Sequence, residues 1–180
     1  MERLIKIESV NDIFPGYRDT PVGRLIEYHN LGRAFNEYSH AEILVGMCMD
    51  NRKQLRIPRN FAYIMRTGGA NLRYNEFQVS YAIGVGRVEY MALIGHTNCA
   101  MVNIEARKDK FIMGLVEVAG WEKDKAEEHY RNFVLMYEIG NELDFLLGEV
   151  SRFRLRYPKI VIVPLMYRLE DNLLYLVRED

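Results

Sequence analysis

The sequence contains little cysteine and no long apolar run, and each shortage excludes a class of protein. Its 180 residues include only two cysteines, Cys48 and Cys99, which excludes a small fold held together by several disulfides. No run of about 18 consecutive apolar residues occurs, so we expect no transmembrane helix. Residues 1–11 mix charged and apolar side chains and lack the apolar stretch of a secretory signal. We therefore expect a cytoplasmic protein, in which a disulfide between the two cysteines would not persist.

The chain also lacks an excess of charge of either sign. Lys and Arg together number 24 and Asp and Glu together number 25, which gives a formal net charge of −1. A broad basic field for nucleic acid is therefore not expected, and neither nucleic acid nor a membrane is an expected partner. The composition, 49% hydrophobic and 27% charged, is that of an ordinary globular protein, and the length fits one domain spanning residues 1–180.

Short apolar runs alternate with helical patterns along the chain. Runs with the length and composition of strands occur at residues 41–47, 60–66, 90–95, 160–167 and 173–177. Helical periodicity occurs at residues 22–38, 76–87 and most of 104–157, where Gly140-Asn141 is expected to separate two helices. This alternation predicts an α/β fold with a central, mainly parallel sheet flanked by helices, an N-terminal helical arm and a helical C-terminal half.

Two local features refine this fold. Pro164 lacks the backbone N–H that a sheet ladder needs, so it predicts an edge strand or a strand end. Residues 1–20 contain Pro15 and Gly16 and are expected to form an irregular arm. Their apolar side chains have no evident hairpin partner in the sequence, so we expect residues 1–40 to make the contact with a second copy of the chain.

Residues able to bind a metal follow two of the expected strands. Functional side chains of open α/β sheets gather at the carboxyl ends of the strands. Cys48 ends the first expected strand, and His96 and Cys99 follow the third. If these strands are neighbours, two thiolates and one imidazole meet, which is a zinc ligand set with one position left open for catalysis. Each residue alone also has a plainer interpretation, as a buried small cysteine or a core histidine.

Asp50 and Arg52 stand two residues apart beside Cys48. In an extended segment this spacing places both side chains on the same side of the chain. The plainer interpretation is a surface ion pair that contributes little to stability.

These segments together resemble the β-class carbonic anhydrases. The resemblance rests on Cys48-Met49-Asp50-Asn51-Arg52, Arg66-Thr67-Gly68-Gly69 and Gly95-His96-Thr97-Asn98-Cys99. The corresponding family patterns are Cys-x-Asp-Ser-Arg, Arg-Asn-Ala-Gly and Gly-His-Ser/Thr-x-Cys-Gly. The resemblance covers most of the chain, and the short length is more similar to the compact prokaryotic branch than to the plant type. It implies zinc ligands at Cys48, His96 and Cys99, a catalytic dyad of Asp50 and Arg52, and a homodimer or a multiple of it.

The chain departs from the family pattern at three places. Asn51 replaces the usual Ser, Thr67-Gly68 replaces Asn-Ala, and Ala100 replaces Gly. The segment between Arg52 and Arg66 is also short for the family, which would remodel the mouth of the pocket. None of these changes removes a ligand or a member of the dyad, so they bear on substrate and rate more than on metal binding.

The function implied is the reversible hydration of carbon dioxide to bicarbonate and a proton by zinc-bound hydroxide. Zinc lowers the pKa of a bound water to about 7, Asp50 would accept a hydrogen bond from the hydroxide, and Arg52 would hold Asp50 ionised. Two alternatives stay open. The same scaffold would also serve a hydrolase of carbonyl sulfide or carbon disulfide, and a zinc-binding homologue without turnover would share the same ligands.

Overall fold

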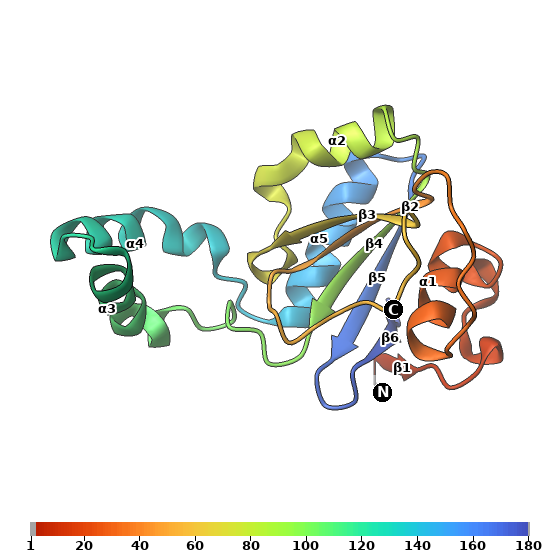
Figure 1. The fold of residues 1–180 in the computed structure, drawn as a ribbon, viewed down its shortest axis with the longest axis horizontal. Coiled ribbons are helices and arrows are strands. Elements are labelled where there is room, and N and C mark those ends of the chain that lie inside the picture. The colour runs from red at the N-terminus through yellow and green to blue at the C-terminus, as the bar shows by residue number, and fades with distance from the viewer. Residues whose placement is uncertain (1–2, 180) are drawn as a thin grey trace.

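The computed structural model describes residues 3–179, and their strands form one six-stranded sheet (Figure 1). The strand order across the sheet is β1-β6-β5-β4-β2-β3. The strands are β1 (Leu4–Lys6), β2 (Ile43–Cys48), β3 (Ala62–Thr67), β4 (Tyr90–His96), β5 (Val161–Arg168) and β6 (Leu173–Val177). The four strands β3, β2, β4 and β5 run parallel to one another. Strand β6 pairs antiparallel with β5, and β1 pairs antiparallel with β6. The predicted central, mainly parallel sheet is therefore confirmed.

Helices cover both faces of this sheet. Helix α1 (Pro21–Asn30) lies on one face, and α2 (Glu76–Gly84) and α5 (Glu142–Arg156) lie on the other. Helices α3 (Lys108–Ala119) and α4 (Lys123–Tyr137) form a hairpin that projects away from the sheet (Figure 1). Short 3-10 helices occur at Val10–Asp12, Pro15–Tyr17, Gly68–Ala70, Arg73–Asn75 and Glu105–Arg107.

The core has two halves because both faces of the sheet are covered. Along β2, Val45 and Met47 belong to the cluster under α1, whereas Leu44 belongs to the cluster under α2 and α5. All six residues of β2 are buried. This explains why the strand has a continuous apolar run rather than an alternating one.

The N-terminal arm packs against the chain's own sheet. Ile5 in β1 pairs with Leu176 in β6, and Ile7 and Ile13 are buried in the core with 1% and 0% of their surfaces exposed. The arm is irregular apart from β1 and two short 3-10 helices, as expected, but its apolar side chains do have a partner within the chain. The partner strand β6 comes from the opposite end of the sequence, so no hairpin motif predicts its pairing with β1.

Two predicted boundaries also differ. The helix expected at residues 22–38 ends at Asn30, and Gly32 follows with φ of +71°, a left-handed conformation that stops a helix. The break expected at Gly140-Asn141 is confirmed, because the Asn141 side chain accepts hydrogen bonds from the first N–H groups of α5.

Pro164 lies inside a strand that has neighbours on both sides. Its Cα partner on β4 is Leu93, whereas pairing with β6 begins one residue later, at Leu165. The prediction of an edge strand or a strand end is therefore wrong, because β5 is an inner strand and Pro164 is its fourth residue. Pro164 stands at the end of the antiparallel ladder only, where a missing donor interrupts little pairing.

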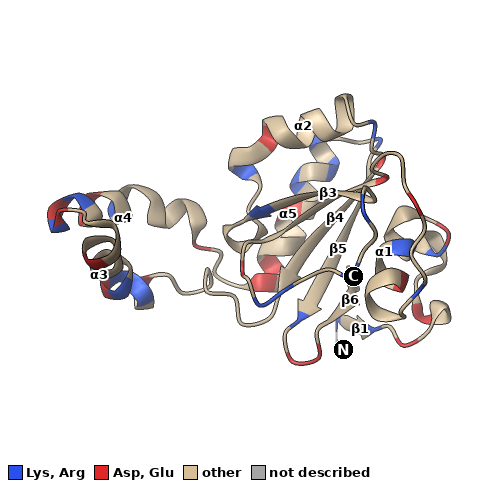
Figure 2. Ribbon diagram, viewed as in Figure 1, with Lys and Arg blue, Asp and Glu red and all other residues tan. Residues whose placement is uncertain are grey.

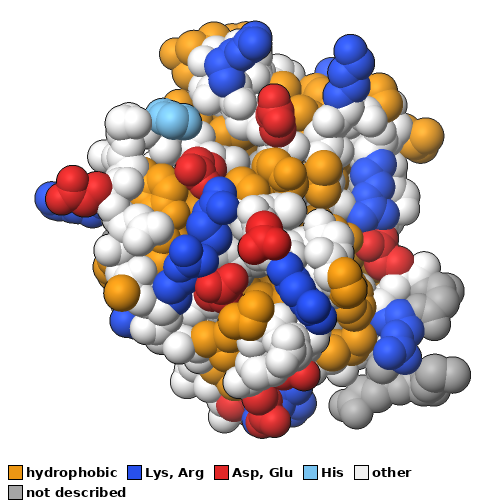
Figure 3. Space-filling view, turned by 90° about the vertical axis from the view of Figure 1, so that its right-hand side faces the viewer, with side chains coloured by type: hydrophobic (Ala, Val, Ile, Leu, Met, Phe, Trp, Pro, Cys, Tyr) orange, Lys and Arg blue, Asp and Glu red, His pale blue; other side chains and the backbone are white. Residues whose placement is uncertain are grey.

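Charged residues of both signs lie mainly on helices and loops (Figure 2). On the face that carries α1, acidic side chains stand beside basic ones with apolar side chains between them (Figure 3). This surface agrees with the nearly neutral composition. None of the helices in the described part of the chain combines the length and apolar character that a membrane crossing requires.

Candidate metal centre

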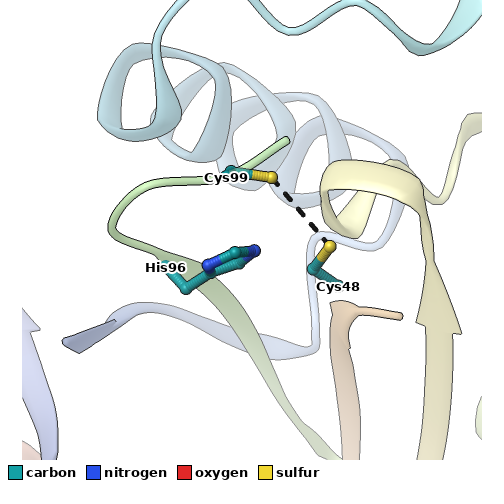
Figure 4. Close-up of side chains that lie close together, drawn as sticks. All are labelled: Cys48, His96 and Cys99. Carbon is teal, nitrogen blue, oxygen red and sulfur yellow. Dashed lines mark hydrogen bonds between the residues drawn. The ribbon is translucent and has the colours of Figure 1, made fainter. Parts of the chain in front are cut away.

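Two adjacent parallel strands carry the three expected ligands to one edge of the sheet. Strands β2 and β4 pair in register from Ile43 with Tyr90 to Met47 with Ile94, so Cys48 and His96 emerge at the same end. The loop after β4 then returns and places Cys99 beside them (Figure 4). The predicted convergence of these three residues is confirmed.

The distances between the ligand atoms suit a tetrahedral metal. The sulfur atoms of Cys48 and Cys99 lie 4.0 Å apart, and all three candidate ligand atoms lie within 4.8 Å of one another. A tetrahedral zinc with Zn–S bonds of about 2.3 Å would place two sulfurs about 3.8 Å apart. Sulfur and imidazole ligands also select zinc over oxygen-preferring ions such as Mg²⁺. The residues therefore fit a zinc ion.

His96 presents one free ring nitrogen to this cluster. Its Nδ1 lies 2.9 Å from the Thr97 carbonyl oxygen, which is the kind of partner that fixes the tautomer of a ligating histidine. Its Nε2 is buried and has no hydrogen-bond partner among residues 3–179. Buried polar atoms are rarely left without a partner, and a metal would satisfy this one.

The two buried thiols shift each other's pKa in opposite directions. The hydrogen bond between them lowers the pKa of Cys48, and the neighbouring His96 ring acts in the same direction. The same contact with Cys48 raises the pKa of Cys99, and burial adds to that increase. A metal bound here would need both sulfurs as thiolates, because the thiolate is the form that ligates.

Asp50 and Arg52 form a bidentate ion pair beside these ligands. Arg52 Nε lies 3.0 Å from Asp50 Oδ1, and Arg52 Nη2 lies 2.6 Å from Oδ2. The hydrogen bond from the guanidinium holds the pKa of Asp50 well below its usual range. The Oδ2 atom also lies 4.0 Å from His96 Nε2, so the carboxylate stands next to the expected metal position.

Cys48 and the dyad line one cavity, and a second cavity adjoins it. The first has a volume of about 400 Å³, and its lining includes Cys48, Asp50 and Arg52. The second has a volume of about 600 Å³ and lies against the α3–α4 hairpin, with a lining rich in aromatic side chains. Met49 and Met101 line both cavities, so an apolar wall joins them.

Sequence reasoning missed two residues that hold this site in place. The Lys53 side chain is 1% exposed, and its Nζ donates a hydrogen bond of 3.0 Å to the Cys48 carbonyl oxygen. Glu142, at the start of α5, accepts a hydrogen bond of 3.1 Å from the backbone N–H of Cys99. Neither residue belongs to an expected motif, and a charged residue in a polar segment gives no signal of burial.

Two further contacts fix the loops that carry the site. Arg66, at the end of β3, donates through Nη2 to the Lys53 carbonyl oxygen at 2.9 Å and through Nη1 to the Asp50 carbonyl oxygen at 3.4 Å. Thr97 donates its hydroxyl to Glu170 at 3.0 Å and accepts the Leu169 N–H at 3.0 Å. The Asp50 loop is thereby tied to β3 and the His96 loop to the turn after β5.

The fold and the site define an α/β protein with three residues placed to bind a metal ion at the carboxyl edge of its sheet. No family model matches this sequence, and no curated protein matches it either. Solved structures do match. A β-carbonic anhydrase isoform I from Trichomonas vaginalis superposes with a TM-score of 0.63, covering 82% of this chain and 90% of that chain at 15% identity.

Two other solved structures give the same result. A carbonic anhydrase from Glaciozyma antarctica has a TM-score of 0.61 at 18% identity, over 78% of this chain and 85% of that chain. The apo form of a carbon disulfide hydrolase has a TM-score of 0.53 at 18% identity, over 78% of this chain and 80% of that chain. The chain has the β-carbonic anhydrase fold, as its motifs predict.

Proposed function

We propose that this protein is a zinc-dependent carbonic anhydrase that hydrates carbon dioxide reversibly to bicarbonate and a proton. The observation that carries the proposal is the cluster of two sulfurs and one imidazole nitrogen within 4.8 Å, with the Asp50–Arg52 ion pair beside it. The fold shared with carbonic anhydrases supports it.

The residues of the cluster have separate roles in this proposal. Cys48, His96 and Cys99 would hold the zinc, which supplies a water acidic enough to react at neutral pH. Asp50 lies beside the expected metal position and its pKa is lowered, so as a carboxylate it would accept a hydrogen bond from that water and orient it. Arg52 fixes the Asp50 carboxylate with two parallel hydrogen bonds, a geometry that a guanidinium matches and an ammonium does not.

The cavity at the site suits a small apolar substrate. Carbon dioxide is linear and uncharged, and it would approach along the wall formed by Met49 and Met101. Apolar contacts in the cavity are enough to bind such a molecule. The polar groups of the candidate metal centre then provide the recognition.

Hydrolysis of carbon disulfide or carbonyl sulfide is the second candidate. It is favoured by one observation, the fold that this chain shares with a carbon disulfide hydrolase. Both substrates are linear and apolar like carbon dioxide, so the same cavity accommodates them.

A direct substrate comparison tests the proposal. The zinc-loaded protein would be assayed for carbon dioxide hydration by stopped flow and for carbon disulfide and carbonyl sulfide hydrolysis by sulfide release. We expect hydration to be fastest. Faster sulfide release would establish the second candidate. Stoichiometric zinc with no acceleration of any of these reactions would show a zinc-binding homologue without turnover.

We also propose that the protein is a cytoplasmic homodimer, or a multiple of one, from the compact prokaryotic branch of the family. Apolar side chains are exposed within residues 1–40, where Val10 and Phe35 are 45% and 50% exposed, and also on the projecting hairpin and α2, where Val118 and Phe77 are 89% and 78% exposed. Exposed apolar surface of this kind marks interaction sites, and twofold symmetry is the commonest way to cover it. Sedimentation velocity on the full chain measures the assembly directly.

A further inference from the structure

Lys53 is a buried charge that the proposed reaction does not use. It follows the Asp50–Arg52 pair in the chain, and its side chain is among the largest fully buried ones in the described residues. Lysine is almost never buried to this extent unless its charge is paired. Its presence here needs a physical reason.

No carboxylate provides that pairing. Among residues 3–179, no carboxylate oxygen lies within 4.0 Å of Lys53 Nζ, whose hydrogen-bond acceptor is the Cys48 carbonyl oxygen at 3.0 Å. Burial lowers the pKa of Lys53, and the nearby Cys48 and Asp50 oppose that effect. The groups that favour the buried ammonium therefore belong to the candidate metal centre itself.

Two hydrogen bonds hold the backbone around Lys53 in place. Its side chain reaches back five residues to the end of β2, and its own carbonyl oxygen accepts a hydrogen bond of 2.9 Å from Arg66. These two contacts close the segment from Cys48 to Lys53, which also carries Asp50, into a fixed turn. A flexible turn here would let the Cys48 sulfur and the Asp50 carboxylate move independently.

We propose that Lys53 is a positioning residue of the metal centre, which fixes the ligand Cys48 through its carbonyl oxygen and balances the negative charge of the ligand set. The inference rests on the metal-binding part of the proposed function and is independent of the substrate. Some groups orient metal ligands by contacting them without binding the metal. Removing such a group typically lowers metal affinity by about 10- to 100-fold.

The test replaces Lys53 with an apolar side chain of similar length. Lys53→Met would be compared with wild type and with Lys110→Met, a control that removes an exposed lysine on α3. We expect Lys53→Met to release zinc at least about tenfold faster in a chelator competition. We also expect the visible spectrum of its cobalt-substituted form to shift, because the Cys48 sulfur is no longer held in place. Lys110→Met should match wild type in both measurements.

Two outcomes would overturn the inference about Lys53, and a third would overturn the proposed function instead. A folded Lys53→Met protein with wild-type zinc release and cobalt spectrum would overturn the inference. If Lys53→Met does not fold, Lys53→Gln keeps a hydrogen-bond donor without the charge, and wild-type zinc release in that variant would also overturn it. Failure of the wild-type protein itself to bind zinc would instead overturn the proposed function, since all three ligands are then intact.

Discussion

Arg52 joins Asp50 to the loop that carries Cys99. Its guanidinium binds both carboxylate oxygens of Asp50, and the same Nη2 atom donates to the Asn98 carbonyl oxygen at 3.0 Å. Asn98 directly precedes the ligand Cys99. The ion pair is thus a mechanical link between the loop after β2 and the loop after β4, and not an isolated surface contact.

Removing Arg52 should therefore separate metal binding from turnover. Arg52→Ala leaves the three ligands intact, so we expect it to keep its zinc. Asp50 loses the partner that orients it, and the rate of carbon dioxide hydration should fall by a factor on the order of 100. Arg52→Lys should recover only part of the rate, because an ammonium cannot form the two parallel hydrogen bonds. Stopped-flow kinetics with zinc analysis would measure both effects, and a fully active Arg52→Ala protein would reduce the pair to a surface contact.

Loss of a single ligand should remove the metal. We expect about one zinc per chain in the wild-type protein, and Cys48→Ser or Cys99→Ser should lose most of it, because a serine hydroxyl is a poor replacement for a thiolate. Elemental analysis of protein purified without added metal provides the measurement. His40→Ala is the matched control, since His40 is exposed on a loop outside the cluster, and it should keep its zinc. Full zinc in both cysteine variants would place the metal elsewhere.

The Asp50 carboxylate should contribute stability with a defined pH dependence. Its pKa in the folded protein lies below the ordinary value of 3.8, so the folded state favours the ionised form. The stabilisation is therefore complete above that ordinary value and is lost as the pH falls through it toward the folded pKa.

We expect metal-free Asp50→Asn to unfold at lower denaturant concentration than the wild type at pH 7. The difference should shrink as the pH falls below about 4. Denaturant titrations of both proteins across this pH range test the sign. A difference that grows toward acid pH would show that the fold destabilises the carboxylate.

The N-terminal arm should serve folding as well as assembly. Deleting residues 1–20 removes β1 and the buried Ile7 and Ile13, so we expect the truncated chain to lose several kcal/mol of stability. A test of association needs exposed residues instead. Val10 and Phe35 are 45% and 50% exposed, and we expect Val10→Asp with Phe35→Glu to weaken the dimer while the unfolding temperature changes little. Sedimentation velocity distinguishes the outcomes: a monomeric wild-type protein would contradict the proposed assembly, and an unaffected dimer would place its contact outside residues 1–40.

The sequence by itself determined the layers of the fold and the chemistry of the site. A continuous apolar run such as β2 predicts a strand that is covered on both faces. The run needs this cover whatever the position of the strand in the sheet. The residue types at Cys48, His96 and Cys99 fix the kind of metal, because affinity for zinc depends on sulfur and nitrogen ligands. Their positions at or just after the ends of two buried strands predicted that they would meet if those strands are neighbours, and the pairing of β2 with β4 meets that condition.

The tertiary structure alone decided which distant segments complete the sheet and the site. The pairing of β1 with β6, the burial of Lys53 and the contact of Glu142 with Cys99 join segments whose own patterns do not refer to each other. Local periodicity reports which side of a segment is apolar, but it does not identify the segment that covers it. A strand's partner and a charge's surroundings depend on contacts made only when the whole chain has folded.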